Sequence, residues 1–117
     1  AYPTRVGEGP FATEMTMERS HELGIEEFGT VTRRQRRIGT WDGKMARYSA
    51  MINGCTQAAI TGIDRIDPAC FGVKDYDRLT RKAKDFIAQA EEDIGKPVTL
   101  ISTGPEMSQI IDLRSEL

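Results

Sequence analysis

The clearest repeating pattern of apolar residues lies between residues 80 and 95, and it predicts an amphipathic helix. Apolar side chains recur there at spacings of three and four, which places them on one helix face: Ala83, Phe86, Ile87, Ala90 and Ile94. Thr80 is suited to cap the start of this helix, and Gly95 is suited to end it. Two short β-rich runs follow, at 98–101 and 110–113. The expected order is therefore helix, strand, loop, strand.

Weaker patterns predict three more elements earlier in the chain. Residues 42–53 indicate a second helix, which stops at Gly54 and carries apolar residues on one side: Met45, Tyr48 and Ile52. The Ala- and Ile-rich run 58–63 indicates a buried strand that closes at Asp64. Residues 13–23 indicate a short, less apolar helix.

The alternation of helices and strands favours an α/β fold. At most three strands are expected in one sheet, which leaves two edges without a neighbouring strand. Open edges pair readily with further strands, and Ala1 is not an initiating residue. We therefore expect a segment of a larger mixed α/β sheet enzyme, with helices packed on a few strands.

Composition limits the class of protein. The chain has 117 residues, of which 38% are hydrophobic and 29% are charged, as in one ordinary soluble domain. No apolar run is long enough to span a bilayer, and no basic-then-apolar start indicates a signal peptide. The two cysteines, Cys55 and Cys70, lack metal-site spacing and are too few for a disulfide scaffold. We expect reduced, buried thiols in a cytoplasmic protein with no membrane partner.

Charge is distributed unevenly along the chain. The formal net charge is −2 and the pI is about 5.4, which argues against a dedicated nucleic-acid binder. Residues 1–32 hold six glutamates and two arginines, whereas residues 33–48 hold six basic residues and one aspartate. Such a local concentration of positive charge commonly has an anionic partner. The single histidine, His21, is expected to be exposed rather than catalytic.

The densest positive charge lies in the segment 29–39, which contains Arg33, Arg34, Arg36 and Arg37. Guanidinium groups this close repel one another unless anions lie between them, and their forked donors suit carboxylates and phosphates. Gly29, Thr30 and Thr32 add backbone and hydroxyl donors suited to a small carboxylate. A solvated basic loop explains the segment, taken alone, about equally well.

Two glycine-containing turns and one aspartate are further candidates. The turn Gly7-Glu8-Gly9-Pro10 allows a ligand to approach the backbone closely. The turn Ser102-Thr103-Gly104-Pro105 follows a predicted strand, where open α/β sheets place ligands, and Asp64 has an equivalent position. A carboxylate there can accept two hydrogen bonds from a guanine edge. Each feature alone is more often a plain turn or a loop cap.

Taken in this order, the segments resemble the adenylosuccinate synthetase family over essentially the whole chain. The matching pieces are 4–11 with Thr13-Glu14, 28–32 leading into the arginines, Asn53-Gly54, 72–75, and 101–105 with Leu113-Arg114. Each piece is common, but the ordered set is specific. The short link between Asp64 and Gly72 resembles the compact, archaeal form of the family.

The resemblance implies that residues 1–117 are a C-terminal part of the enzyme, with an aspartate and IMP loop in the region 4–39 and a guanine-binding part in the region 58–105. Arg34 is similar to an arginine that reaches both the aspartate and the IMP ribose. Val6 is similar to a backbone contact with IMP, and Arg36 is implied to lie near GTP as well. The implied substrate-binding residues are Val6, Thr30, Val31, Thr32, Arg34 and Arg36. The implied GTP-binding residues are Arg36, Gly62, Ile63, Asp64, Ser102, Thr103 and Gly104.

The family joins IMP and L-aspartate to adenylosuccinate in purine biosynthesis. In the implied reaction GTP phosphorylates O6 of IMP, and the aspartate amine then displaces phosphate. The resemblance implies that the catalytic base, a catalytic histidine, the phosphate loop and the Mg2+ site all lie in the N-terminal half, which this chain lacks. We expect the chain to bind substrates without catalysing the reaction alone, and the complete enzyme to be a cytoplasmic homodimer.

The chain departs from the family pattern at two positions. Many members have glycine in place of Arg33, so the backbone there is expected to be strained, or loop closure to be restricted. Many members have lysine in place of Gly62, which leaves more of the base recognition to Asp64 and Ser102.

One function of a different class remains as an alternative. A noncatalytic nucleotide- or RNA-binding module would use the cluster Arg33–Arg37, and its binding would fall steeply with salt. The acidic pI and the lack of aromatic residues beside the arginines count against this alternative.

Overall fold

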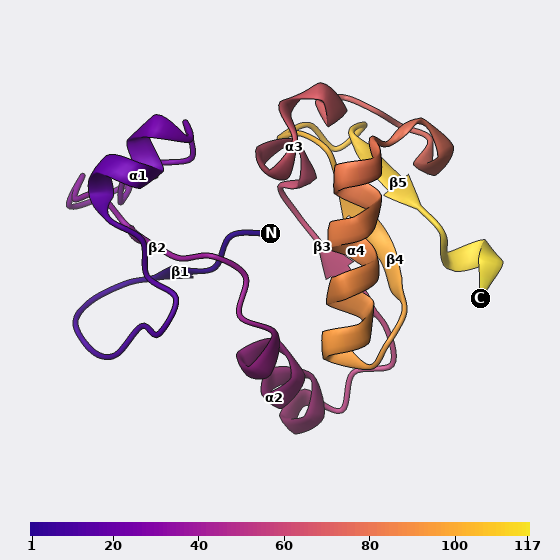
Figure 1. The fold of residues 1–117 in the computed structure, drawn as a ribbon, viewed down its shortest axis with the longest axis horizontal. Helices are drawn as coiled ribbons and strands as arrows, with labels where there is room; N and C mark the ends of the chain where they lie inside the picture. The colour runs from indigo at the N-terminus through magenta and orange to yellow at the C-terminus, as the bar shows by residue number, and fades with distance from the viewer. The chain divides into compact units, whose positions relative to one another are not determined.

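A computed structural model describes residues 1–117 of the chain. The chain divides into two compact units, Ala1–Asp42 and Gly43–Leu117. Each unit has its own sheet and its own buried side chains, and each is described by itself below (Figure 1).

The second unit is built on a three-stranded sheet. Its strands are β3 (Ala58–Ile60), β4 (Val98–Ser102) and β5 (Ile110–Asp112), in the order β3-β4-β5. β3 runs parallel to β4, and β5 runs antiparallel to it. Because the register pairs Ile101 with both Ile60 and Ile111, three buried isoleucines lie side by side across the sheet. The sheet is mixed, as expected, and β3 and β5 are its two edges in this chain.

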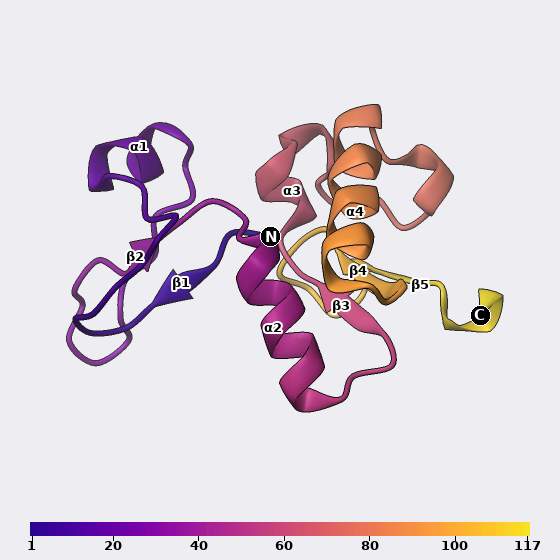
Figure 2. The same ribbon diagram turned by 60° about the horizontal axis from the view of Figure 1, so that its bottom comes forward.

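Helix α4 (Arg81–Ile94) confirms the strongest sequence prediction. The Thr80 side chain accepts a hydrogen bond from the Ala83 amide at its start, and Gly95 ends it with a φ of 75°. Its buried face carries Ala83, Ile87 and Ala90, and the helix packs against β4 (Figures 1 and 2). None of the helices in the structure has the length and apolar character needed to cross a membrane.

Helix α2 (Gly43–Asn53) forms where the sequence predicted a second helix, but its apolar face is not buried in this chain. It packs against α4, and Arg47 Nε donates to the Asp93 carbonyl oxygen at 2.9 Å near the end of α4. Its apolar side chains nevertheless remain 56–69% exposed: Met45, Tyr48, Met51 and Ile52. The periodicity predicts the helix from local spacing, but spacing alone does not supply a partner that buries the apolar face.

The predicted strand 58–63 is wrong at its C-terminal end. β3 stops at Ile60, Gly62 has a left-handed backbone with a φ of 76°, and a short helix α3 (Ile63–Ile66) begins directly after it. Asp64 therefore lies in the first turn of α3. The apolar run misled the prediction because Ile63, which is fully buried, belongs to the helix and not to the strand.

Short 3-10 turns complete the second unit, and both cysteines lie in it. The turns are η1 (Pro68–Cys70), η2 (Tyr76–Arg78) and η3 (Arg114–Glu116). Cys70 is a buried free thiol, as predicted, whereas Cys55 is also free but only partly buried.

The first unit is held by a two-stranded sheet that the sequence did not predict. β1 (Thr4–Arg5) pairs antiparallel with β2 (Arg37–Ile38), and a further bridge joins Glu14 to Gly39. Ladders of two residues are too short to produce a periodic pattern. Helix α1 (Met17–Glu22) is shorter than the predicted 13–23 and is capped by Thr16. The buried side chains of this unit are Ser20, Ile25 and Ile38.

Candidate functional site

A hollow of about 450 Å³ lies in the first unit, between the two segments that the sequence singled out. One side is formed by Arg5, Val6, Gly7 and Glu8, and the other by 29–32 and 34–37. The hollow therefore brings together every predicted substrate-binding residue: Val6, Thr30, Val31, Thr32, Arg34 and Arg36. Residues 6 and 34 are far apart in sequence, and the pairing of β1 with β2 draws their segments together.

Backbone hydrogen bonds close the segment 29–36 into a tight loop. The Gly29 amide donates to the Arg34 carbonyl oxygen at 2.8 Å, and the Arg33 amide donates to the Gly29 carbonyl oxygen at 2.9 Å. The Arg36 amide donates to the Glu27 carbonyl oxygen at 2.7 Å. The loop is thus ordered by its own backbone, which leaves the side chains of Arg34 and Arg36 available at the hollow.

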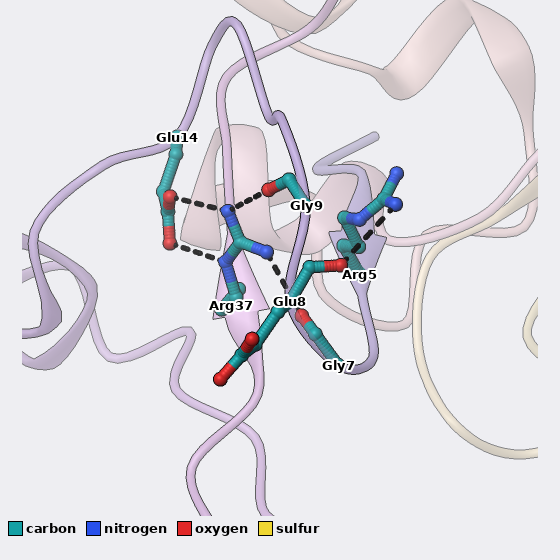
Figure 3. Close-up of polar contacts among 6 residues, drawn as sticks. All are labelled: Arg5, Gly7, Glu8, Gly9, Glu14 and Arg37. Carbon is teal, nitrogen blue, oxygen red and sulfur yellow. Dashed lines mark hydrogen bonds and ion pairs between the residues drawn. The ribbon is translucent and has the colours of Figure 1, made fainter.

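The four arginines of this loop and the strand after it have two different environments. The Arg37 guanidinium donates hydrogen bonds to both carboxylate oxygens of Glu14 at 2.8 Å. It also donates to the carbonyl oxygens of Gly7 and Gly9, again at 2.8 Å (Figure 3). The side chains of Arg33, Arg34 and Arg36 form no hydrogen bond or ion pair in this chain. One of the four charges is neutralised internally, whereas Arg34 and Arg36, which line the hollow, have no side-chain partner in this chain.

The pair of Glu14 and Arg37 shifts the titration of both groups. The hydrogen bond between Arg37 and Glu14 holds the pKa of the Glu14 carboxyl below its usual value. The same bond raises the pKa of Arg37. A carboxyl whose folded pKa is depressed stabilises the folded state above its unfolded pKa. That contribution is lost as the pH falls through the lower, folded pKa.

We expect acid to loosen the first unit at this pair. As the pH falls below the ordinary glutamate range, Glu14 protonates and its bonds to Arg37 weaken, so backbone amides near Gly7 and Gly9 exchange faster with solvent. Carboxyl NMR titration of Glu14 combined with amide hydrogen exchange measures both events. A Glu14→Gln variant should lack this transition. A Glu14 pKa at or above the usual value would contradict the expectation.

Arg33 confirms the backbone strain expected from its replacement of glycine. It is the only non-glycine residue in the structure with a positive φ, at 54°. For a residue with a Cβ, this left-handed conformation costs about 1–2 kcal/mol. The side chain does not line the hollow, so the strain does not serve a contact there.

We expect substitutions of Arg33 to change the free energy of unfolding according to how well the new residue tolerates a positive φ. Arg33→Gly should change the free energy of unfolding by less than about 1 kcal/mol, because relief of strain offsets the added freedom of the unfolded chain. Arg33→Val should destabilise by about 1–2 kcal/mol, because a β-branched residue tolerates this backbone poorly. Urea unfolding measures both, and equal effects of the two variants would contradict the strain.

The second group of predicted residues lies at the carboxyl ends of β3 and β4. Because these strands are parallel neighbours, the segments that follow them emerge at the same edge of the sheet. Asp64, in the first turn of α3, is half-buried and forms no side-chain hydrogen bond or ion pair in this chain. The Ser102 hydroxyl donates to the Gly104 carbonyl oxygen at 2.9 Å. Its oxygen keeps acceptor capacity, and the Asp64 carboxylate is free to accept.

Thr103 has a different environment from its neighbours. Its side chain is fully buried, and its hydroxyl donates to the Val73 carbonyl oxygen at 2.7 Å. Its amide donates to the Gln109 carbonyl oxygen at 2.9 Å, and its own carbonyl oxygen accepts from the Gly72 amide at 3.0 Å. All its polar groups are engaged within the chain, so its side chain holds the loop rather than facing a ligand.

Gln109 is a supporting residue that sequence reasoning missed. Its side-chain oxygen accepts from the Glu106 amide at 2.9 Å, and its backbone oxygen accepts from the Thr103 amide. Its carboxamide also lies against Gly104, where a Cβ would collide with it. A side chain at position 104 would have to displace this carboxamide, and the glycine after the strand was the only signal in the sequence that a neighbour approaches there.

The two remaining predicted GTP-binding residues, Gly62 and Ile63, lie at the start of α3. The Ile63 side chain is fully buried in the core. Gly62 has a φ of 76° as the residue before α3, a conformation in which lysine would be strained. The left-handed turn before α3 therefore favours a glycine at this position.

The residues present do not form a metal site. No group of three or more His, Cys, Asp or Glu side chains lies close enough together to hold an ion. His21 is exposed, as predicted, and its Nδ1 lies 2.9 Å from the Glu26 carboxylate.

Comparison with known proteins identifies the family. The family model for adenylosuccinate synthetase matches residues 1–70. The adenylosuccinate synthetase of Archaeoglobus fulgidus is 65% identical over 98% of this chain, and that of Methanocaldococcus jannaschii is 57% identical over 99%. Both are archaeal, as the short link after Asp64 predicted. The chain spans 34% of the length of each.

Two solved structures share the fold. The fully ligated adenylosuccinate synthetase of Plasmodium falciparum superposes with a TM-score of 0.84 at 24% identity, covering 95% of this chain and 38% of that one. The cyanophage S-2L succinoaminodeoxyadenylate synthetase, solved with dGMP and dATP, gives 0.70 at 22% identity, covering 96% and 31%. The expected fold, a segment of a larger mixed α/β enzyme, is confirmed. The family model, which matches residues 1–70 and thus more than half of the chain, shows that the chain belongs to the adenylosuccinate synthetase family.

Proposed function

We propose that this chain is a C-terminal part of an adenylosuccinate synthetase, which ligates IMP and L-aspartate at the expense of GTP. The observation that carries the proposal is the hollow in Ala1–Asp42. It presents two unpaired guanidinium groups, Arg34 and Arg36, beside Thr30 and Thr32. A small molecule with two carboxylates, such as L-aspartate, matches this set of donors.

In this proposal the loop 29–36 binds L-aspartate and the opposite side of the hollow binds IMP. Arg34 forms charge-assisted bonds to an aspartate carboxylate and reaches the IMP ribose. Arg36 lies near both the aspartate and GTP. Thr30, Val31 and Thr32 enclose the aspartate, and Val6 contributes its backbone to IMP. The tight backbone bonding of the loop supports this arrangement, because ordered donors lose less entropy on binding.

The guanine base of GTP binds at the carboxyl ends of β3 and β4. The Asp64 carboxylate accepts from N1–H and from the 2-amino group of guanine, and Ser102 adds a hydrogen bond. The backbone of Gly62, Ile63 and Gly104 shapes the site, while Thr103 fixes the turn. The unpartnered, half-buried carboxylate of Asp64 supports this role, because such a group gains from a ligand donor.

This chain binds and orients the reactants, and the chemical steps use groups outside it. Phosphorylation of IMP O6 by GTP converts that oxygen into a leaving group, and the aspartate amine displaces it as phosphate. Mg2+ offsets phosphate charge in such a transfer, and we place its site, the catalytic base and the phosphate loop on the remaining part of the enzyme. That part also completes a cytoplasmic homodimer.

The test is formation of adenylosuccinate from IMP, L-aspartate and GTP with Mg2+. The chain is assayed alone, and then together with the remaining two thirds of the family's length. No turnover by the chain alone and turnover on combination is the expected result. Turnover by the chain alone would mean that the catalytic groups lie here. Binding of many RNA sequences that falls steeply with salt, without turnover on combination, would favour the alternative function.

A further inference from the structure

The four bonds of Arg37 join the two sides of the hollow. Arg37 lies on β2, directly after the loop 29–36, whereas Gly7 and Gly9 belong to the turn on the opposite side. Figure 3 shows the guanidinium between the Glu14 carboxylate and this turn. Its Nη1 donates to the Gly7 carbonyl oxygen and its Nη2 to that of Gly9, each at 2.8 Å.

The environment of Arg37 is constructed around the guanidinium. The Phe11 ring lies 5.6 Å from its Cζ in a cation–π arrangement. A Cβ on Gly39 would lie 2.6 Å from Phe11 Cε1, so the ring is held between the guanidinium and this glycine backbone. The side chain is only 22% exposed, compared with 58% for the Arg19 side chain on α1. The low exposure and the contact with Phe11 show that Arg37 has a defined position and is not a freely solvated arginine.

We propose that Arg37 is a positioning residue, which sets the width of the hollow by fastening the turn 7–9 to the end of the loop 29–36. This inference rests on the proposed function of the hollow as the aspartate and IMP site. The Arg37 guanidinium donates four hydrogen bonds, to the Glu14 carboxylate and to the carbonyl oxygens of Gly7 and Gly9. Because these donors are occupied, Arg37 does not bind substrate in this proposal. Its effect on binding passes through the turn that follows Val6 and through the loop that carries Arg34.

Only a planar forked cation satisfies the four acceptors at once. Two parallel bonds to Glu14 fix the plane of the guanidinium, and that plane aims the remaining N–H groups at the two carbonyl oxygens. A lysine ammonium at the same place keeps the charge but has no such fixed geometry. Arg37→Lys should therefore release the turn while leaving the net charge of the site unchanged.

The test measures steady-state kinetics of the complete enzyme that carries this chain, with Arg37→Lys. The KM for L-aspartate and for IMP should rise by about 10-fold or more, with kcat changed by less than about 3-fold, because binding must now order the turn. The KM for GTP should rise by less, because the guanine base binds at the carboxyl ends of β3 and β4, outside the first unit. Glu14→Gln, which keeps an acceptor but loses the charge, should shift both KM values in the same direction and by less.

A merely structural role would give a different result. It would lower the melting temperature and the active fraction, and hence kcat, with both KM values unchanged, and that outcome would overturn the proposal. The matched control is Arg19→Lys, which alters an exposed pair with Glu22, 3.1 Å apart in the same unit and away from the hollow. It should leave all three KM values unchanged. Unchanged kinetics in both Arg37→Lys and Glu14→Gln would also overturn the proposal.

A second readout separates this inference from the proposed function. Amide hydrogen exchange of peptides covering 6–10 should be faster in Arg37→Lys than in the unaltered protein, with peptides from α4 unchanged. This result does not depend on turnover. If the unaltered enzyme makes no adenylosuccinate, the proposed function fails while faster exchange still supports the fastening of the turn. Unchanged exchange would overturn the inference even in an active enzyme.

Discussion

Replacement of Arg34 by methionine in the complete enzyme is expected to lower kcat/KM for L-aspartate by about 100- to 1,000-fold. Methionine keeps much of the aliphatic length and removes only the forked cation. The Arg34 side chain has no partner within this chain and lines the hollow, so its donors are free for a ligand. A charge-assisted bidentate bond to a carboxylate is the strongest contact that the hollow offers. Steady-state kinetics with L-aspartate as the varied substrate measures the loss.

The neighbouring Arg33 supplies the control for this prediction. Arg33→Gly removes the same charge from the same loop, and glycine accepts the φ of 54° at that position. Arg33 does not line the hollow, so kcat/KM should change by less than about 3-fold. Equal losses in the two variants would mean that the loop acts through its net charge. The specific contact assigned to Arg34 would then be wrong.

Asp64→Asn is expected to change the base that the enzyme accepts. A carboxylate accepts from two guanine donors, whereas the asparagine amide offers one acceptor and one donor, so kcat/KM for GTP should fall by about 100-fold. Xanthine has an oxygen in place of the 2-amino group, and the new amide can donate to it. Turnover with xanthosine triphosphate should therefore rise. Kinetics with the two nucleotides measures the exchange.

The control for the base exchange is Asp85→Asn. Asp85 lies on α4, where it forms an exposed ion pair with Arg81. Its removal should leave the preference for GTP unchanged. If Asp64→Asn lowered activity equally with both nucleotides, the residue would serve the fold of α3 and not the base. The half-buried, unpartnered position of its carboxylate argues for the base.

Elements with complete local signals were predicted well. Helix α4 begins after a Thr80 cap and ends at the left-handed Gly95, and its buried residues repeat with the helix period. Those signals act within a few residues, so one sequence contains them all. The strain at Arg33 was also predictable, because a family position that favours glycine indicates a positive φ. The positive φ of Gly62 was not predictable in this way, and only the structure shows the turn before α3 in which this glycine lies.

Features that depend on distant partners were missed or mistaken. β1 and β2 exist because residues 4–5 meet residues 37–38, and neither segment alone has the pattern of a strand. Ile63 was assigned to a strand because burial on a sheet and burial under a helix both require an apolar residue. The apolar face of α2 was identified correctly, but its exposure in this chain was not, because periodicity says nothing about what covers a face.

The arginine cluster shows which properties of the site follow from the sequence and which depend on the tertiary structure. The sequence by itself determined the family, the helices with local caps, and the concentration of forked cations that needs anions nearby. Only the tertiary structure decided that Arg37 is neutralised by Glu14 and the turn 7–9, while Arg34 and Arg36 keep their donors free at the hollow. The reason is physical: composition and spacing state how many charges a segment carries, but the partner of each charge depends on which distant backbone and side chains folding brings within hydrogen-bond distance.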